Sequence, residues 1–393
     1  MRSFVSERAK EIPLSGIRVI FEKAQSMSDV VRLEVGEPDF DTPENIRAAA
    51  LEALRRGETH YTSSAGILAL REEISRKFHS DNSLDYDAKT QIVVTAGSQN
   101  SLNLALMAIV NPGEEVLIPD PGWPNYEILT RIAQGIPVRY PLKEKNRFRL
   151  DQDDLRSRVN KKTKAIIICS PSNPAGSVLE EKHLQAVASI AEENDLLVIS
   201  DEIYEKIIYG TAKHRSIGAL PGMAERVVTV NGFSKAYAMT GWRLGYAGGP
   251  REIIGQMIKL NTGLNTCASS IAQRAGVEAL KGPQDSVRQM REEYLRRRDF
   301  LLGRLREIPG LTCTVPDGAF YTFPNIQAFG LTSFDFAMAL LDQAKVSTVP
   351  GSAFGASGEG YIRISYANSI EQIGKAIDRI APAIRAGLKA AKT

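Results

Sequence analysis

Short apolar runs alternate with amphipathic segments through the middle of the chain. Five runs are largely apolar and rich in β-branched residues, and we expect strands at residues 91–95, 115–119, 165–169, 196–200 and 227–230. Such runs are typical of parallel strands that are covered on both faces. Segments with helical spacing, including 100–110 and 181–194, lie between them. The alternation predicts an α/β fold whose large domain has a doubly wound, mostly parallel sheet. We expect seven strands in this sheet, of which these runs account for five.

The last hundred residues follow a different pattern. It predicts a long charged helix, several short strand-like pieces and a final amphipathic helix. We expect the opening segment to pack with this region, so that both chain ends build a smaller α/β domain. The predicted division is an N-terminal arm and part of the small domain at 1–46, a large cofactor-binding domain at 47–285 and the rest of the small domain at 286–393.

Length and composition limit the class of protein. A chain of 393 residues is long enough for two packed units. Hydrophobic residues make up 43% and charged residues 24%, close to the averages for globular proteins, so a disordered chain is not expected. The N-terminus lacks the apolar stretch of a secretion signal, and no apolar run is long enough for a membrane helix. We therefore expect a cytoplasmic protein without a membrane partner.

Charge and cysteine content argue against two kinds of ligand. The 49 basic residues barely outnumber the 46 acidic ones, so no broad cationic field favours a nucleic acid. The run Arg296–Arg298 lies among glutamates at helical spacing and is interpreted as a solvated helix face. Cys169, Cys267 and Cys313 are widely separated and follow no metal-binding spacing, so neither a disulfide nor a metal site is expected.

Polar side chains follow several of the predicted strands. The carboxyl ends of parallel strands share one edge of a sheet, and α/β sheets bind their ligands at that edge. We therefore expect these side chains to lie together. They are Gly97, Ser98, Gln99, Trp123, Asn173, Asp201, Tyr204, Ser234 and Lys235.

This set contains the groups that pyridoxal phosphate requires. Lys235 could form a Schiff base with the cofactor aldehyde and carry protons, although most lysines are surface charges. Asp201 ends a buried strand, where an unpaired carboxylate is costly, and a protonated ring nitrogen would be its partner; a helix-capping role is the alternative. Asn173 and Tyr204 could bond the ring oxygen, or Asn173 could only shape a turn.

Other residues could complete the cofactor site. Residues 97–99 open a predicted helix, whose free N–H groups and dipole favour a phosphate. Ser234 and Arg243 could contact the same phosphate, or Arg243 could form only a structural salt bridge. Trp123 could stack on a flat ring or belong to the core.

The order of these motifs resembles the class I and II family of fold-type I aminotransferases, especially the branch that includes prokaryotic aspartate and aromatic aminotransferases. The matching stretches run through nearly the whole chain: "GEPDFDTP", "HYTSSAGILALREEI", "TAGSQNSL", "PGWPNY", "SPSNPAG", "SDEIY", "SKAYAMTGWRLGY" and "YIRISYA". The most specific pair is "SDEIY" before "SKAYAMTGWRLGY" at this separation.

The resemblance implies a pyridoxal 5'-phosphate site. Lys235 would hold the cofactor aldehyde and move a proton between the substrate α-carbon and the cofactor. Tyr61 would reach the phosphate of a neighbouring subunit, which implies a homodimer with shared sites. The cofactor-binding residues implied with them are Gly97, Ser98, Gln99, Trp123, Asn173, Asp201, Tyr204, Ser234 and Arg243.

The resemblance also implies how the substrate binds. Arg363 lies on an alternating strand and would bind the α-carboxylate with a bidentate guanidinium; an arginine on an edge strand is the alternative. Trp123 and Asn173 would contact the substrate. Gly36 would let the backbone approach it, and the N-terminal arm near Ile17 would close over it.

The expected reaction is ping-pong transamination from an L-amino acid to a 2-oxo acid, with 2-oxoglutarate as the expected acceptor. Relatives that prefer dicarboxylic substrates often carry a lysine in the "TAG" segment or an arginine in a later loop. Here Gln99 occupies the first position, and residues 261–273 contain no Arg or Lys. Aspartate and an aromatic or broad range of donors both stay open.

Functions other than transamination are compatible with parts of this pattern. A pyridoxal-phosphate-dependent β-lyase could use the same residues, and a non-catalytic aminotransferase-like binding module is a second alternative. A nucleotide-dependent Rossmann enzyme is not supported, because no G-x-G-x-x-G follows the first predicted strand.

Overall fold

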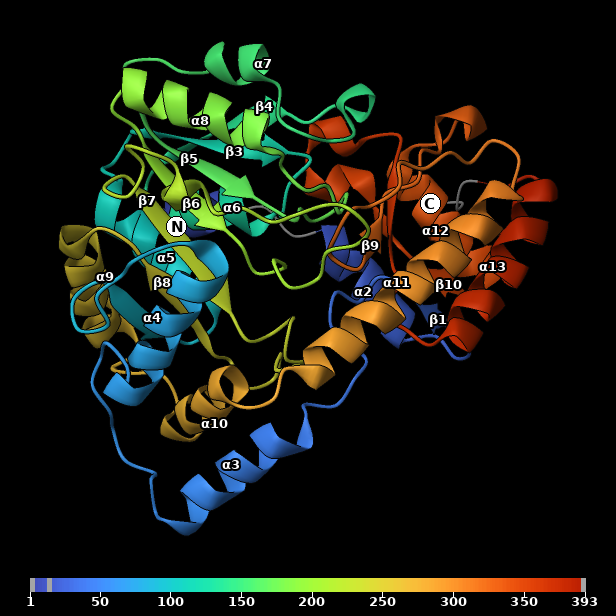
Figure 1. Cartoon of the computed structure of the whole chain (residues 1–393). Coiled ribbons are helices and arrows are strands. Elements are labelled where there is room, and N and C mark those ends of the chain that lie inside the picture. The colour runs from blue at the N-terminus through green and yellow to red at the C-terminus, as the bar shows by residue number, and fades with distance from the viewer. Residues whose placement is uncertain (1–3, 13–15, 390–393) are drawn as a thin grey trace.

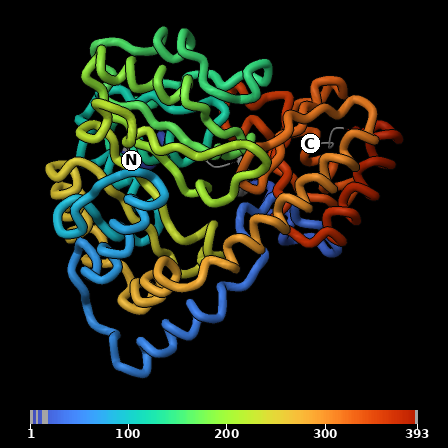
Figure 2. The backbone as a smooth tube through the Cα atoms, in the orientation of Figure 1, coloured from blue at the N-terminus to red at the C-terminus, as the bar shows by residue number. Residues whose placement is uncertain are grey.

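The computed structural model describes residues 4–12 and 16–389 of the chain (Figure 1). The chain forms a larger lobe around a seven-stranded sheet and a smaller lobe that contains the last of the described residues (Figures 1 and 2). Helix α11 (Asp285–Arg306) runs from the larger lobe into the smaller one.

The large sheet has the strand order β2-β8-β7-β6-β5-β3-β4. Strand β8 is antiparallel to both of its neighbours, whereas β7, β6, β5, β3 and β4 run parallel to one another. The predicted mostly parallel, seven-stranded sheet is confirmed. The strands are β2 (Ile92–Thr95), β3 (Glu115–Asp120), β4 (Ile136–Pro141), β5 (Thr163–Cys169), β6 (Leu197–Asp201), β7 (Val227–Gly232) and β8 (Gly245–Gly248).

Helices cover both faces of this sheet. The side chains of β5 alternate: Ile167 packs in one apolar cluster with Leu102 of α5, whereas Ile166 packs in another with Val187 of α8. The helices of the larger lobe are α3 (Glu44–Arg55), α4 (Leu68–Asn82), α5 (Ser98–Ile109), α6 (Asn125–Ile132), α7 (Gln152–Arg156), α8 (Glu181–Glu193), α9 (Arg251–Leu264) and α10 (Ser270–Lys281). Burial on both faces explains why β2, β3, β5, β6 and β7 read as continuous apolar runs.

The smaller lobe is built from both ends of the chain, as predicted. Strand β1 (Val31–Arg32) pairs in parallel with β10 (Val346–Ser347), and Leu33 belongs to the same apolar cluster as Ile364. Strands β11 (Val349–Pro350), β12 (Ile362–Ser365) and β9 (Tyr321–Thr322) form an antiparallel sheet in that order. The helices of this lobe are α2 (Gly16–Gln25), α12 (Ser333–Ala339) and α13 (Ile370–Arg385), whereas α1 (Glu7–Glu11) lies against α6 of the larger lobe. Domain boundaries at residues 46 and 285 stay a prediction.

The interpretation of Arg296–Arg298 as a solvated face is wrong for part of the run. These residues do lie on a helix, α11, but Arg297 is only 5% exposed. It pairs with Asp39 (2.6 Å) and Glu293 (2.8 Å), and its guanidinium lies over the ring of Phe40. The charge pattern did not reveal this burial because Asp39 and Phe40 come from the distant N-terminal segment.

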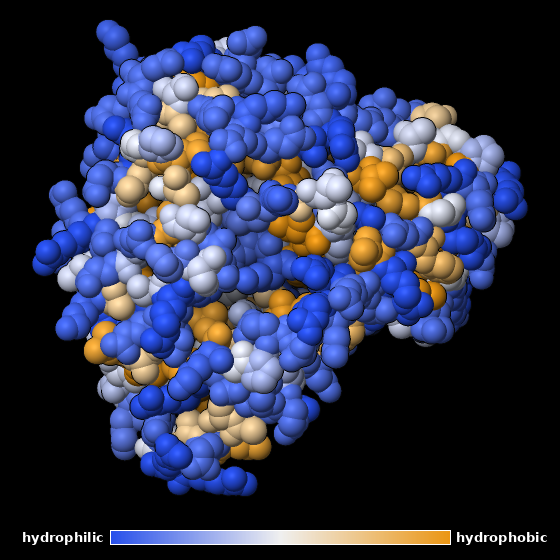
Figure 3. All heavy atoms as spheres, viewed as in Figure 1, coloured by the Kyte–Doolittle hydropathy of each residue, from blue (hydrophilic) through white to orange (hydrophobic). Residues whose placement is uncertain are grey.

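The visible surface is mainly hydrophilic. In Figure 3 hydrophobic residues appear on this face in small groups, including some near the junction of the two lobes. Within residues 4–12 and 16–389, no helix combines the length and apolar character that crossing a membrane requires.

Candidate active site

A cavity of about 280 Å³ lies where the carboxyl ends of several large-sheet strands face the smaller lobe. Eight of the residues predicted from the sequence line it: Gly36, Ser98, Trp123, Asn173, Asp201, Tyr204, Lys235 and Arg363. The larger lobe supplies most of them, and Arg363 comes from β12 of the smaller lobe. The fold therefore brings together residues from both lobes around one small space.

Lys235 is the only lysine among the described residues that line this cavity. Its Nζ donates a hydrogen bond to the carbonyl oxygen of Gly36 (2.6 Å). Desolvation lowers the pKa of Lys235 to about 8, and repulsion from Arg363 acts in the same direction, whereas Glu37 and Asp201 oppose it. A larger fraction of this amine is therefore neutral near pH 7 than for an exposed lysine, as a nucleophile or base requires.

The carboxylate of Asp201 lies at the end of β6 and is only 4% exposed. It accepts hydrogen bonds from the hydroxyl of Tyr126 (2.7 Å) and from the backbone N–H of Ile203 (3.3 Å). Desolvation raises the pKa of Asp201 to about 6, although both hydrogen bonds oppose the rise. A buried carboxylate in this state is stabilised by a cationic group, such as a protonated ring nitrogen.

Tyr126 is a site residue that the sequence analysis missed. It is 1% exposed, and its ring meets that of Trp123 edge to face, with 5.5 Å between centroids. The signal was present, because Tyr126 stands three residues after Trp123 in the "PGWPNY" stretch at the start of α6. The turn that leads into α6, in which the Tyr126 N–H donates to the Trp123 carbonyl oxygen (3.0 Å), brings the two side chains together.

Two tyrosines and a glycine form one wall of the cavity. The hydroxyls of Tyr204 and Tyr321 lie 2.9 Å apart, and that of Tyr321 donates to the carbonyl oxygen of Gly36 (3.4 Å). A Cβ atom on Gly36 would lie 2.6 Å from the Tyr321 hydroxyl oxygen. Only glycine leaves room for this approach. Tyr321 was also missed, since no motif distinguishes it within "GAFYTFP".

The guanidinium of Arg363 is 3% exposed and lies between two aromatic rings, 4.4 Å from the centroid of Tyr321 and 5.0 Å from that of Phe354. Nη1 donates to Asn173 Oδ1 (3.1 Å) and Nη2 to the carbonyl oxygen of Glu34 (2.6 Å). Both acceptors are neutral, and Nε has no hydrogen-bond partner among the described residues. A buried cation with a free donor fits a carboxylate ligand. Strand β12 is the middle strand of its sheet, so this is not an edge-strand arginine.

The first turn of α5 meets Arg243 beside the cavity. Gly97 has a φ of +88°, and a Cβ atom there would lie 2.7 Å from Arg243 Nη2. Arg243 is exposed, and its Nη1 donates to the carbonyl oxygen of Thr240 (3.0 Å). Gly245 of β8 lies against the same turn, because a Cβ there would be 2.3 Å from the Ser98 nitrogen. Close packing thus places the N-terminus of α5 and the guanidinium of Arg243 next to each other beside the cavity.

The remaining predicted residues do not line the cavity. Gly97, Gln99, Ser234 and Arg243 neighbour lining residues in the chain or in space, and Gln99 is exposed. Tyr61 is 87% exposed. The arm was expected to close near Ile17, whose side chain lies outside the described residues.

Helix α2 of this arm does reach the cavity through Phe21, which the sequence analysis did not single out. The guanidinium of Arg32 lies 4.5 Å from the centroid of the Phe21 ring, and its Nε donates to the carboxylate of Glu34 (2.7 Å). The N-terminal arm therefore contributes an aromatic side chain to the site.

A basic amine, a buried carboxylate and a buried guanidinium in one cavity suit chemistry on an amino acid, and comparison with known proteins gives the family. The model of the family "Aminotransferase class I and II" matches residues 28–380. The chain belongs to this family. The similarity of this aminotransferase to its relatives extends over almost the whole chain.

Two curated relatives and one solved structure give the range of similarity. The aspartate aminotransferase of Pyrococcus abyssi is 47% identical, with 97% of this chain and 98% of the relative covered. The aromatic-amino-acid aminotransferase 2 of Thermococcus litoralis is 44% identical, with 96% and 97% covered. The structure of the aspartate aminotransferase from Thermus thermophilus with maleate superimposes with a TM-score of 0.93 at 38% identity, with 98% and 100% covered. The aminotransferase fold and the transaminase class of this protein are thus established.

Proposed function

We propose that this aminotransferase binds pyridoxal 5'-phosphate and moves an amino group from an L-amino acid to a 2-oxo acid in two half-reactions. The observation that carries the proposal is the placement of Lys235, Asp201 and Arg363 around one cavity, each with a charge state suited to a different part of the reaction. A β-lyase would use the same residues, and no contact of the cavity favours it.

The residues present fit the cofactor. Buried Asp201, with its raised pKa, would receive a positive partner, which the protonated ring nitrogen provides. Tyr204 and Asn173 would bond the ring oxygen, and Trp123 would lie against the ring. The N-terminus of α5 at Ser98, with Gly97, Gln99, Ser234 and Arg243 nearby, would take the phosphate. When bound, the cofactor supplies an electron sink that weakens the bonds at the substrate's α-carbon.

The chain's own residues would bind and orient the substrate and move the proton. Arg363 would hold the α-carboxylate through its terminal nitrogens, exchanging neutral oxygen partners for a charged one. The Lys235 amine would hold the cofactor aldehyde, and once released would take the proton from the α-carbon and return it to the cofactor. Its lowered pKa keeps enough of the amine neutral for that task. Phe21 and Trp123 would exclude water from the reacting atoms.

Substitution of the lysine tests this proposal. We expect Lys235→Ala to lower turnover by about four orders of magnitude, since the general base and the cofactor attachment are both lost. Borohydride treatment followed by peptide mapping should label Lys235 in the wild type only. Lys259→Ala on α9 is the control, because that lysine lies outside the cavity. Retained turnover, or a label on another lysine, would contradict the assignment.

The lining of the cavity favours aromatic or broad donors over aspartate. Among the described residues that line it, only Lys235 and Arg363 are Lys or Arg, whereas Phe21, Trp123 and Ile203 supply apolar surface. The relatives' names include both aspartate and aromatic aminotransferases, and one relative was solved with the dicarboxylate maleate. An apolar wall favours an aromatic side chain, and a distal carboxylate would need a cation there.

A panel of amino donors with 2-oxoglutarate tests this specificity. We expect kcat/KM for phenylalanine and tyrosine to exceed that for aspartate by at least about tenfold, as one unpaired buried carboxylate implies. The reverse order would point to a cation supplied from elsewhere. Release of pyruvate and ammonia from a cysteine conjugate without any acceptor would show a lyase instead.

We further propose a homodimer with shared sites in the cytoplasm. A tyrosine that is 87% exposed, Tyr61, supports the dimer, because large aromatic side chains favour burial in an interface. Mixed dimers of Tyr61→Ala and Lys235→Ala chains test this sharing. Restored cofactor affinity in one site of each mixed dimer is the expected result.

A further inference from the structure

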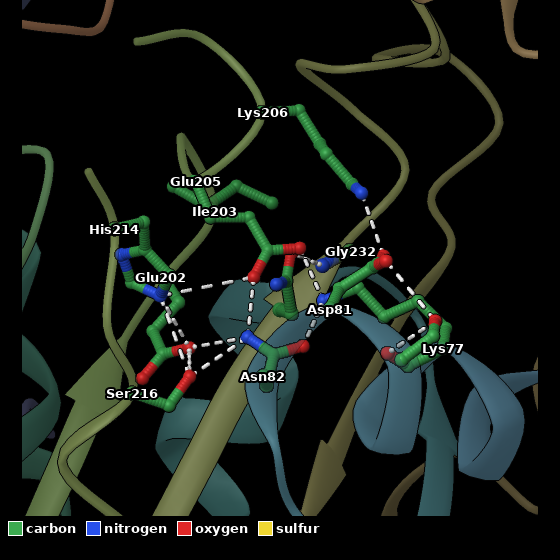
Figure 4. Close-up of polar contacts among 12 residues, drawn as sticks. Lys77, Asp81, Asn82, Glu202, Ile203, Glu205, Lys206, His214, Ser216 and Gly232 are labelled. Atoms are coloured by element: carbon green, nitrogen blue, oxygen red, sulfur yellow. Dashed lines mark hydrogen bonds and ion pairs between the residues drawn. The ribbon is translucent and has the colours of Figure 1, made fainter. Parts of the chain in front are cut away.

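A buried polar network lies directly behind the segment that carries Asp201 and Tyr204. Asp201, Ile203 and Tyr204 face the active-site cavity, whereas Glu202 and Glu205 do not line it. Figure 4 shows Glu202 and Glu205 gathered instead with side chains of α4 and of the stretch after residue 210. We call this the rear network, and its members are Lys77, Asn82, Glu202, Glu205, His214 and Ser216.

Asn82 is the centre of the rear network. Its Nδ2 donates to Glu202 Oε2 (3.1 Å), Glu205 Oε2 (2.7 Å) and the hydroxyl oxygen of Ser216 (2.7 Å). Its Oδ1 accepts from the ammonium of Lys77 (2.7 Å), which also pairs with Glu205. Both carboxylates are thus held by the C-terminal end of α4 (Figure 4).

His214 closes the rear network on its outer side. Its Nε2 lies 2.9 Å from Glu202 Oε2 and 3.8 Å from Glu205 Oε2. Glu202 also accepts from the hydroxyl groups of Ser216 (2.6 Å) and Ser200 (2.8 Å). Glu202 is 1% exposed, and the side chain of His214 is 9% exposed. Burial this deep makes any net charge in the network expensive.

The charges in the rear network balance when His214 is protonated. Glu202 and Glu205 then carry two negative charges, and Lys77 and His214 two positive ones. Attraction to Glu202 raises the pKa of His214 although desolvation opposes it, and attraction to Lys77 and His214 lowers the pKa of Glu205 to about 2 against desolvation. The groups that face His214 are those two carboxylates and the Lys77 ammonium.

A metal ion does not suit this place. Ligand atoms of Glu202, Glu205 and His214 lie within 4.8 Å of one another. However, the Lys77 ammonium and the Asn82 amide already direct N–H groups at the carboxylate oxygens. A divalent ion would have to displace these donors, so the cluster is a closed ionic network.

We propose that the rear network holds the cofactor-binding segment 201–205 in place. Protonation of His214 then determines the net charge of the network, and this charge acts on the ionisation of Asp201 and Lys235. The inference rests on the proposed function. Two observations carry it: the segment alternates between the cavity and the network, and Glu202 acts electrostatically on Asp201 in the direction that raises its pKa.

The charge balance can be changed by substitution of one or two side chains. His214→Gln leaves the network with a net charge of minus one, whereas His214→Gln with Glu205→Gln restores neutrality. Ser216→Ala removes a hydrogen bond to Glu202 at constant charge, and His79→Gln, on the exposed face of α4, is the matched control. Because one buried charge acts over several ångströms, the single variant should shift nearby ionisations.

Visible absorption of the enzyme with added pyridoxal phosphate provides the readout, since its pH dependence follows protonation of the Lys235 nitrogen. We expect His214→Gln to raise the pH midpoint by roughly 0.5 unit and the double variant to return it toward wild type. Apoprotein melting and cofactor affinity, measured alongside, should fall in Ser216→Ala without a midpoint shift. If His214→Gln does not fold, Glu205→Gln alone should move the midpoint downward.

The outcomes separate the two proposals. An unchanged midpoint in both His214→Gln and Glu205→Gln, with only a lowered melting temperature, would overturn the inference while leaving the proposed function intact. Failure of the wild type itself to bind pyridoxal phosphate would instead overturn the proposed function.

Discussion

Lys235 and Asp201 have pKa values displaced toward each other. Burial lowers the pKa of the lysine to about 8 and raises that of the aspartate to about 6. A site that separates acid and base functions by environment in this way is typical of enzymes that move protons near neutral pH. Burial between the two lobes thus gives Lys235 and Asp201 the shifted pKa values on which their reactivity depends.

Tyr126 is expected to keep Asp201 ionised. Its hydrogen bond lowers the pKa of Asp201, so Tyr126→Phe should raise that pKa further above 6. Cofactor affinity, which depends on the ionised carboxylate, should then fall at a pH about one unit higher than in the wild type as the solution is acidified. Titration of pyridoxal phosphate into apoprotein between pH 5 and 8, a range set by about one unit on either side of the shifted value, measures this.

Tyr140→Phe is the matched control for that experiment. Tyr140 is also buried, but its hydroxyl donates to the carbonyl oxygen of Ile167 in the sheet and not to Asp201. Its removal should lower stability and leave the pH dependence of affinity in place. If cofactor affinity depended on pH in the same way in Tyr126→Phe and wild type, Tyr126 would have no effect on the ionisation of Asp201.

At the scale of elements, the sequence pattern predicted the strands that are buried on both faces. Five strands were predicted because two-sided burial requires continuous apolar runs, as in β5. Strands β4 and β8 were missed for physical reasons. Strand β4 is a partly exposed edge strand that contains Pro137 and Pro141, and β8 reads "GYAG". Its Gly248 is required because a Cβ there would lie 2.5 Å from the ring of Tyr86.

The candidate site was predictable where a residue follows a strand of the large sheet. Asp201 and Lys235 were found that way, because strand ends determine where their side chains meet. Phe21 and Tyr321 were not found, since they reach the cavity only through packing of the smaller lobe against the larger one. Arg363 was assigned only through the resemblance, for the same reason.

The contact between β8 and α5 gives a test at this scale. Gly245→Ala would place a methyl group 2.3 Å from the Ser98 nitrogen, so the first turn of α5 must move. We expect a loss of about 1–3 kcal/mol in unfolding free energy and weaker binding of pyridoxal phosphate. Gly255→Ala, in α9 with open space around the new methyl group, should be neutral or stabilising. Similar affinity of both variants for pyridoxal phosphate would show that the first turn of α5 does not bind the phosphate.

For the whole molecule, the buried Glu205 makes stability sensitive to acid. Its pKa is lowered from 4.5 to about 2, so the stabilisation is complete above about pH 4.5 and is lost as the pH falls toward 2. The difference corresponds to at most about 3 kcal/mol. Glu205→Gln should therefore flatten the acid limb of the unfolding free energy measured in urea, whereas Glu292→Gln, an exposed residue of α11, should not. Parallel acid limbs for wild type and Glu205→Gln would count against this linkage.

The pairing of β1 with β10 ties the catalytic machinery to the order in which a ribosome delivers the chain. Strand β1 leaves the exit tunnel early, yet Val31 meets Val346 and the guanidinium of Arg363 arrives only after both. A nascent polypeptide can complete the large sheet while its first strand still awaits a partner. Turnover therefore requires synthesis to continue through β12, and a premature stop codon at or before codon 363 removes the substrate anchor altogether.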